Sequence, residues 1–257
     1  MATAPWKEGA SNMSSNSPKN ESILAFENER ATLSDNLLAV TIDGVSVQVK
    51  QGTTILAAAA RAGVKTPTLC FLKDVSNIGS CRMCVCEVTG QQALVPACNT
   101  PVVNGMEVIT DSPRVHAARK MALELIMANH RTQCLTCVKN GACELQDLGR
   151  EFGMEELTFE APAKNAPVLD SNPFLSFNPN LCIACQRCVG ACNTAAGNHT
   201  LRTGKRGVRT TIQAPFGPNW KATQCESCGN CAQACPTGAL TEKRRGNYRE
   251  WEVSRVR

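Results

Sequence analysis

The chain has 257 residues, a formal net charge of +5 and 16 cysteines, but only 7 Phe, 3 Trp and 1 Tyr. Its length allows several domains, and the scarcity of aromatic side chains argues for small modules rather than one large core. No apolar stretch approaches the roughly 18 residues of a membrane span, and no secretory signal opens the chain. We therefore expect reduced cysteines that bind metal in the cytoplasm rather than disulfides. The modest charge, with no aromatic-interleaved basic run before the last 20 residues, gives no argument for nucleic acid.

The N-terminal part of the sequence predicts a polar leader and then a small sheet domain. Residues 1–37 are rich in Ser, Asn, Glu and Lys, which is typical of a disordered or partner-docking leader. From residue 38, LLAVTI and VSVQV flank Asp43–Gly44 and predict a hairpin. A helix follows, with Thr53 as its cap and Gly63 as its stop. The strand-like runs CVCEV and MEVIT complete a β-grasp-like order over 38–111.

The remaining chain divides into a helical segment and a duplicated module. Ser112 and Pro113 open a predicted helix that ends near His130, and this second domain spans 112–160. A proline-rich linker is expected at 161–179. The last module, 180–245, contains CIACQRCVGAC and CESCGNCAQAC at an offset of 43 residues, which indicates duplication, and a basic tail occupies 246–257.

The first group of cysteines has the spacing C-x10-C-x2-C-x13-C and comprises Cys70, Cys81, Cys84 and Cys98. Four thiolates in such a loop-rich region can bind either a 2Fe-2S cluster or zinc. Zinc prefers two close pairs and only one is present, so the cluster is favoured. Cys86 shares a face with Cys84 in a predicted strand, and we expect it to be a buried free thiol rather than a ligand.

The second group has the spacing H-x3-C-x2-C-x5-C and comprises His130, Cys134, Cys137 and Cys143. Three cysteines need a fourth ligand, and His130 is the only imidazole nearby in the sequence. We therefore expect a 4Fe-4S cluster with one His and three Cys ligands. Replacing thiolate by imidazole removes one negative charge, which favours the reduced state.

The third and fourth groups are two complete C-x2-C-x2-C-x3-C runs, the pattern of bacterial two-cluster ferredoxins. In that pattern the fourth cysteine of each run binds the cluster of the other run. Pro236 follows the last cysteine of the second run, whereas Asn193 departs from this pattern in the first. The expected sets are Cys182, Cys185, Cys188 and Cys235 for one 4Fe-4S cluster, and Cys225, Cys228, Cys231 and Cys192 for the other.

These assignments use 15 cysteines and one histidine for one 2Fe-2S cluster and three 4Fe-4S clusters, with about 14 irons. The oxidised sites then carry a total charge of about −7, which leaves the loaded chain near −2. The positive charge of the polypeptide is therefore interpreted as counter-charge for its own cofactors.

Three motif blocks, TPTLCFLKDVSNIGSCRMCVCEV, HRTQCLTCVKNGACELQDLG and the two runs ending in CPTGAL, resemble a known electron-input module. It occurs in the large iron–sulfur subunit of complex I, in diiron hydrogenases and in NAD-linked formate dehydrogenases. The resemblance covers about residues 38–245. It implies an α+β protein with a β-grasp 2Fe-2S ferredoxin-like domain, a helical 4Fe-4S segment with one His and three Cys ligands, and a two-cluster bacterial-ferredoxin-like domain. Both complete runs are kept, as in the formate dehydrogenase and diiron hydrogenase versions.

The sequence has no G-x-G-x-x-G loop, no P-loop and no Ser, His and Asp set, so we expect no catalytic residue. The resemblance implies an electron-relay subunit between a flavin-bearing, NAD(P)-binding diaphorase-like subunit and a catalytic subunit. Because the chain stops at Arg257, that catalytic subunit is expected to be separate. The closing WEVSRVR resembles fused formate dehydrogenases and favours a molybdenum or tungsten formate dehydrogenase. An NAD(P)-linked hydrogenase, bifurcating or not, is the alternative.

Two other classes of protein are alternatives to a relay subunit. A zinc-binding interaction module could contact nucleic acid through EKRRGNYREWEVSRVR, but a solvated or subunit-facing tail explains that segment better. A stand-alone electron carrier needs neither the polar leader nor the basic tail. Iron and acid-labile sulfide analysis separates the cluster-containing classes from the zinc module.

Overall fold

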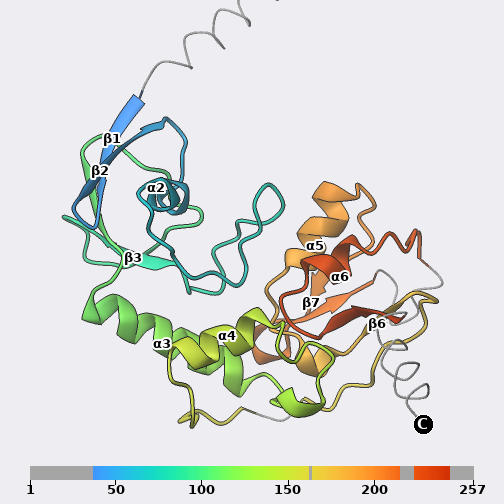
Figure 1. The fold of residues 1–257 in the computed structure, drawn as a ribbon. Coiled ribbons are helices and arrows are strands. Elements are labelled where there is room, and N and C mark those ends of the chain that lie inside the picture. Colours follow the sequence, from blue (N-terminus) through green and yellow to red (C-terminus); the bar gives the residue numbers. More distant parts are fainter. Residues whose placement is uncertain (1–36, 162–163, 215–222, 244–257) are drawn as a thin grey trace, which may run out of the picture.

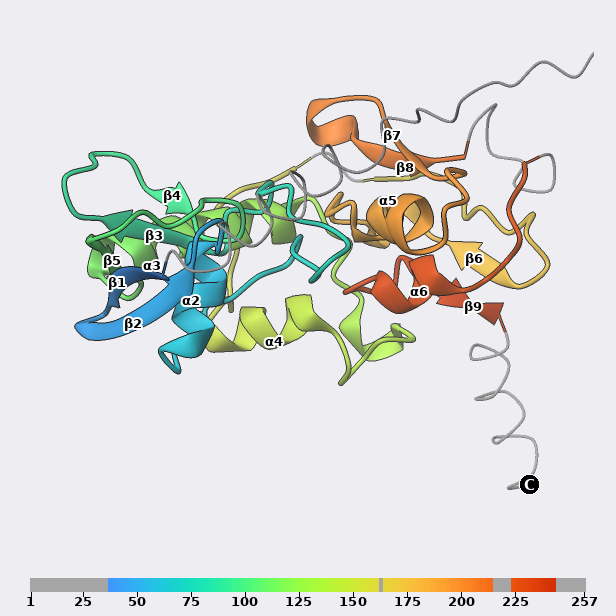
Figure 2. The same ribbon diagram turned by 90° about the horizontal axis from the view of Figure 1, so that it is seen from above.

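The computed structural model describes residues 37–161, 164–214 and 223–243. The predicted leader, apart from Leu37, and the basic tail therefore lie outside the described residues. Figures 1 and 2 show a sheet-containing part at one end, a part built from short helices and ribbons at the other, and helices α3 and α4 linking them. None of the helices in the described ranges is both long enough and apolar enough to cross a membrane.

The sheet begins with the predicted hairpin. Strands β1 (Leu37–Ile42) and β2 (Val45–Lys50) pair antiparallel throughout. Asp43 and Gly44 join them with φ values of 48° and 84°, the left-handed conformation that a tight two-residue hairpin turn requires. The Asp43 carboxylate also accepts hydrogen bonds from the backbone N–H and the hydroxyl of Thr110, at 2.7 and 2.6 Å. These hydrogen bonds tie the turn to the C-terminal end of the sequence of this domain.

Three further strands complete a mixed sheet. They are β3 (Val85–Val88), β4 (Val95–Pro96) and β5 (Met106–Ile109), and the order is β2-β1-β5-β3-β4. Strands β1 and β5 are parallel, whereas the other neighbours are antiparallel. The prediction of strands in CVCEV and MEVIT is confirmed, and β4 was not expected.

Helix α2 (Ile55–Arg61) crosses this sheet, and its cap differs from the prediction. Thr54, not Thr53, is the N-cap, and its hydroxyl accepts a hydrogen bond from the N–H of Ala57 at 3.3 Å. The N–H of Thr53 is instead used in the turn that follows β2. Gly63 ends the helix as predicted, with a φ of 79°.

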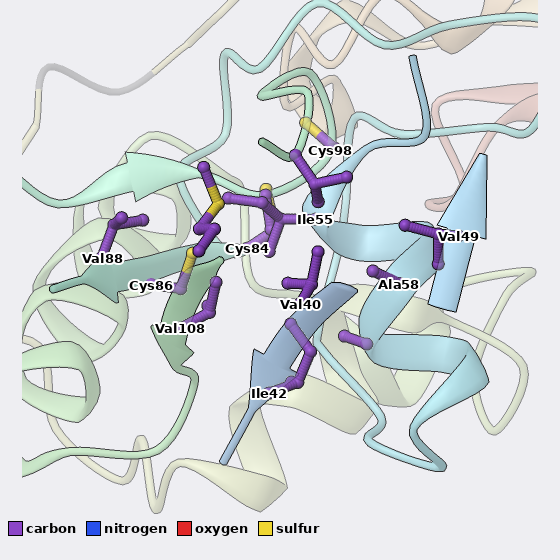
Figure 3. Packing of buried hydrophobic residues seen from close by; sticks show 14 residues of the cluster. Val40, Ile42, Val49, Ile55, Ala58, Cys84, Cys86, Val88, Cys98 and Val108 are labelled. Carbon is purple, nitrogen blue, oxygen red and sulfur yellow. The ribbon is translucent and has the colours of Figure 1, made fainter. Parts of the chain in front are cut away.

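The core of the sheet domain lies between the sheet and α2 (Figure 3). Val40, Ile42, Val49 and Ile55 are at most 1% exposed, and each contributes about 1.5–3 kcal/mol by full burial. Three thiols, those of Cys84, Cys86 and Cys98, belong to the same hydrophobic cluster. The first group of cysteines is therefore anchored on a packed core.

Helices α3 (Pro113–Ala128) and α4 (Glu144–Glu151) follow. Ser112 caps α3 by accepting a hydrogen bond from the N–H of Val115 at 3.1 Å, and Asn129 ends the helix, as the sequence predicts. The two helices share an apolar cluster that contains Leu123, Leu145, Leu148 and Phe152.

The last part of the chain has only short elements. Its ribbons are β6 (Leu175–Phe177) with β9 (Leu240–Glu242), and β7 (Arg202–Gly204) with β8 (Thr211–Gln213). Its α-helices are α5 (Arg187–Gly190) and α6 (Asn230–Ala234). Single turns at Pro179–Leu181, Ala191–Ala195 and Gly207–Arg209 complete this part, and a further turn at Cys134–Thr136 lies between α3 and α4. Strand β6 lies within the segment expected to be a linker, which is therefore part of the fold there.

Candidate iron–sulfur cluster sites

The first site lies where the loop after α2 meets strand β3. Cys70, Cys84 and Cys98 are at most 1% exposed, and Cys81 is half-buried. The N–H of Cys81 donates to the sulfur of Cys70 at 3.5 Å. The structure thus brings together all four residues that the spacing grouped.

The four thiols form a connected set, in which Cys70 contacts Cys81 and Cys98, and Cys98 contacts Cys84. Hydrogen bonds from its two neighbours lower the pKa of Cys70, and the bond from Cys98 lowers the pKa of Cys84 to about 7. The same contacts raise the pKa of Cys81 and of Cys98. The contacts thus favour thiolate, the form that binds metal, at Cys70 and Cys84, and the closeness of all four thiols fits the ligands of a 2Fe-2S cluster.

Cys86 lies apart from this set, fully buried, and its thiol donates to the carbonyl oxygen of Val95 at 3.6 Å. Burial raises its pKa to about 12, so the thiol is protonated at neutral pH. This placement agrees with the expected spare, apolar cysteine.

Arg119 is a residue near this site that the sequence reasoning missed. It is 7% exposed, and its Nη2 donates to the carbonyl of Val85, the residue after Cys84, at 2.9 Å. A signal was present in the sequence. Arg119 stands one helical turn from Val115 and one from Leu123, on the apolar face of α3, where a charged residue needs a buried partner.

The second site surrounds a small hollow between α3 and α4. His130, Cys134, Cys137 and Cys143 all line this hollow, together with Leu181 and Gly238. His130 follows the end of α3, and Cys143 is the N-cap of α4. Two helix ends and the turn between them therefore gather the predicted group around one point.

The imidazole of His130 fits a metal-ligand role. Its Nδ1 atom is buried and has no hydrogen-bond partner among the described residues. Burial lowers the pKa of His130 to about 4, and the nearby cation of Lys164 adds to this effect. A neutral imidazole with an unpaired ring nitrogen, in a hollow that three thiols also line, is suited to bind iron.

The two ferredoxin runs exchange their last cysteines. One hollow is lined by Cys182, Cys185, Cys188 and Cys235. The pKa of Cys231 is raised to about 12 by burial and then by the nearby thiols of Cys225, Cys192 and Cys228. Each run thus contributes three cysteines to one site and one cysteine to the other, as the ferredoxin pattern predicts.

The duplication extends to the backbone. Ala184 and Gln186 have φ values of 55° and 61°, and Ser227 and Gly229, 43 residues later, have 57° and 81°. Left-handed residues in such loops turn backbone N–H groups toward an anion. In the first loop the N–H of Ala184 donates to the sulfur of Cys182 at 3.4 Å.

The missing proline after Cys192 has a structural consequence. In the second run, α6 ends at Ala234, directly before Cys235 and Pro236. In the first run the helix continues from α5 into a π-helical turn over Ala191–Ala195. Proline cannot continue a helix, so its absence lets this helix run on past the cysteine.

Within the described residues, no three His, Cys, Asp or Glu side chains gather closely enough to hold one metal ion. The four ligands of a 4Fe-4S cluster bind four different irons and so stand further apart than the ligands of a single ion.

An ion pair joins the second site to the ferredoxin part. Arg187 lies between Cys185 and Cys188, its side chain is 6% exposed, and its two terminal nitrogens donate to both carboxylate oxygens of Glu144 at 2.7 and 2.9 Å. The N–H of Glu144, next to Cys143, also donates to the carbonyl of Pro236 at 3.2 Å. The sequence reasoning missed this pair, although a charged residue inside a cysteine run is a visible signal.

One hydrophobic cluster touches three of the sites. It contains Leu69 and Met83, which neighbour cysteines of the first site, and Cys143 of the second site. Cys81 and Ile183, from the first site and the first ferredoxin run, pack against it. The first site, the His130 site and the first ferredoxin site are therefore in side-chain contact with a common core.

A glycine permits the close approach of the first loop to the ferredoxin part. A Cβ atom on Gly190 of α5 would lie 2.5 Å from the carbonyl oxygen of Val75. No side chain fits at that distance, so Gly190 allows the loop that follows Cys70 to lie directly on α5.

The comparisons with known proteins agree with this arrangement. A 2Fe-2S iron–sulfur cluster binding domain matches residues 35–113, and an NADH-ubiquinone oxidoreductase-G iron–sulfur binding region matches 119–157. The ferredoxin-like domain of NADH-quinone oxidoreductase subunit 3 matches 172–241. A crystal structure of an NAD+-reducing [NiFe]-hydrogenase superposes with a TM-score of 0.74 at 32% identity, over 80% of this chain and 87% of that chain.

The chain belongs to the family of complex I and hydrogenase iron–sulfur modules. Among curated relatives, an NADH-quinone oxidoreductase subunit of the G type from Rhizobium meliloti is 38% identical over 85% of this chain. NADP-reducing hydrogenase subunit HndD of Solidesulfovibrio fructosivorans is 39% identical over 80% of it. This module spans only 26% and 36%, respectively, of the length of these two relatives.

Proposed function

We propose that this module is an electron-relay subunit that carries one 2Fe-2S cluster and three 4Fe-4S clusters. The proposed ligands are the four sets placed above, with His130 in the second. Iron–sulfur clusters exchange single electrons, and the protein sets the potential of each through charge, hydrogen bonds and exposure. When bound, the clusters supply the redox chemistry, and the chain positions them.

The observation that carries this proposal is the contact between sites. Electron transfer slows steeply with distance, so a relay needs its cofactors close together. The shared cluster around Leu69, Met83 and Cys143 supports this closeness, since three of the sites meet there. The hydrogen bond from Glu144 to Pro236 supports it further, because it joins the neighbours of Cys143 and Cys235.

The proposed partners are a flavin-bearing, NAD(P)-binding subunit and a catalytic subunit. Relatives named as parts of NADH-quinone oxidoreductase and NADP-reducing hydrogenase support an NAD(P)-linked partner. The formate dehydrogenase prediction rests on the two complete cysteine runs and on residues 251–257, which lie outside the described residues, and it stays a prediction. The hydrogenase alternative gains support from the two hydrogenase relatives, one curated and one a solved structure.

The test uses the intact complex, purified anaerobically through a tag on this chain. Native mass spectrometry identifies the partners, and activity is measured with formate or hydrogen as the electron donor. NAD(P) or a viologen dye that reacts directly with the catalytic partner serves as the acceptor. A Cys188→Ser variant should lose NAD(P)-linked activity and keep dye-linked activity, with Cys86→Ser as the matched control. NAD(P)-linked activity that survives in both variants would contradict a relay through this site.

A further inference from the structure

Lys164 stands between two of the cluster sites. Its Nζ atom donates to the carbonyl oxygen of Cys182 at 2.7 Å, and its side chain is half-buried. Leu181, the residue before Cys182, lines the hollow of the His130 site. The Lys164 amine therefore lies beside the backbone that joins the His130 site to the first ferredoxin site.

The charge of Lys164 has no carboxylate partner within ion-pair distance in the part of the chain that the structure describes. Other cations, Lys205 and Arg209, line a cavity of about 590 Å³ that Lys164 also lines, so its surroundings on that side are positive. A half-buried cation in such a place needs an anion nearby.

The cluster sites would supply that anion. An oxidised 4Fe-4S site with four thiolates carries about −2, and one with three thiolates and an imidazole carries about −1. Uptake of one electron makes each site more negative by one charge, with no bond made or broken in the protein. A fixed cation close to both sites stabilises the reduced state of both.

We propose that Lys164 is a shared counter-charge that raises the reduction potentials of the His130 cluster and of the cluster bound by Cys182, Cys185, Cys188 and Cys235. This inference rests on the proposed cluster assignments. Lys164 touches neither a substrate nor an iron in this account, so it is a positioning residue that acts through charge. The cluster of the second ferredoxin run has no contact with Lys164 among the described residues and serves as an internal reference.

The experiment is a redox titration of the anaerobically purified full chain, followed by electron paramagnetic resonance. Lys164→Met removes the charge and keeps an apolar stem, and Lys164→Arg keeps the charge. Lys205→Gln is the matched control, because Lys205 is an exposed lysine of the same cavity. In the methionine variant both potentials should fall by about 59 mV, which corresponds to tenfold in a one-electron equilibrium. Lys164→Arg and Lys205→Gln should stay close to the unmodified protein.

Cluster signals with unchanged potentials in Lys164→Met would overturn the proposal. Loss of the two clusters in Lys164→Met with retention in Lys164→Arg would support it, because charge would then be the property required. Loss in Lys164→Arg as well would overturn it, since the amine rather than its charge would matter. Absence of any cluster signal from the unmodified chain would instead reject the proposed function.

Discussion

The sheet domain and the ferredoxin part hold their cysteines in opposite ways. In the sheet domain, three of the 14 residues of the buried core cluster are cysteines, and the rest are apolar side chains between a five-stranded sheet and α2. In the ferredoxin part, five of the 13 are cysteines, and the surrounding elements are three-residue strands and helices of four or five residues. The first site is attached to a mostly apolar core, whereas the cysteines of the ferredoxin sites form a large part of the core around them.

This difference implies different origins of stability. We expect the sheet domain, whose core cluster is mostly aliphatic, to fold largely through its own packing. The ferredoxin part resembles small metal-dependent domains, in which the binding free energy of the metal is folding free energy. We therefore expect the two parts to respond differently when the clusters are removed.

The largest expected effect follows from removal of all clusters by a chelator under oxidising conditions. Amide hydrogen exchange at β6, β9 and α6 should accelerate by about 100-fold or more, because the stabilisation by bound cofactor is lost. Exchange at β1 and β2 should change much less, since Val40, Ile42 and Val49 remain packed. Hydrogen-exchange mass spectrometry of the loaded and depleted chain measures these exchange rates. Equal acceleration in both parts would contradict the proposed difference in the origin of their stability.

Single cysteine changes sharpen the comparison by testing the exchanged ligands. Cys235→Ser should remove the same electron paramagnetic resonance signal as Cys182→Ser, with a loss of up to about four irons per chain. Cys86→Ser is the control and should keep all the iron, because the Cys86 thiol bonds to the carbonyl of Val95 instead. A Cys235→Ser variant that loses the signal of the Cys225, Cys228 and Cys231 site would refute the crossed arrangement.

A core truncation should affect the sheet domain alone. Ile42 is fully buried in β1, so Ile42→Ala is expected to lower the free energy of unfolding of this domain by about 2–5 kcal/mol. Val45→Ala is the control, because Val45 is 47% exposed. Hydrogen exchange in β1 and β5 reports the change, and the potentials of the ferredoxin clusters should not move. A shift of those potentials would show that the two parts are coupled more tightly than this account states.

The smallest effects concern the ion pairs. Arg187→Gln should destabilise the ferredoxin part by about 1–2 kcal/mol, a value reduced from that of a fully buried pair because the Glu144 side chain is 49% exposed. Asp147→Asn removes the exposed pair with Arg150 and should change stability by less than about 0.5 kcal/mol. Denaturant unfolding of the loaded chain compares the stability of the two variants. Equal losses of stability would contradict the argument that the more buried ion pair contributes more.

Local sequence signals predicted much of this fold. Asp43–Gly44 predicted the hairpin because few residue pairs adopt two left-handed conformations in succession, and Ser112–Pro113 predicted the start of α3. The cap of α2 was misplaced by one residue, from Thr54 to Thr53, because adjacent threonines have equal capping chemistry. Strand β6 was missed because a three-residue strand among prolines and asparagines has no periodicity to detect.

The grouping of the cysteines could be predicted because spacing along the chain limits which thiols can meet. The charges around them could not. Lys164 and Arg119 come from segments outside the cysteine motifs, and only tertiary packing brings them to the sites. Glu144 directly follows Cys143, but its pairing with Arg187 also depends on tertiary packing. These contacts are long-range, so motif spacing does not show which partner each residue meets.

The most direct test of the central claim is the measurement of iron, acid-labile sulfide and zinc per chain after anaerobic purification. The proposed ligand sets predict about 14 irons and about 14 sulfides, with a brown absorbance that dithionite bleaches. A colourless chain that contains zinc and no sulfide would contradict the account, because the cysteines would then hold single ions that carry no electrons.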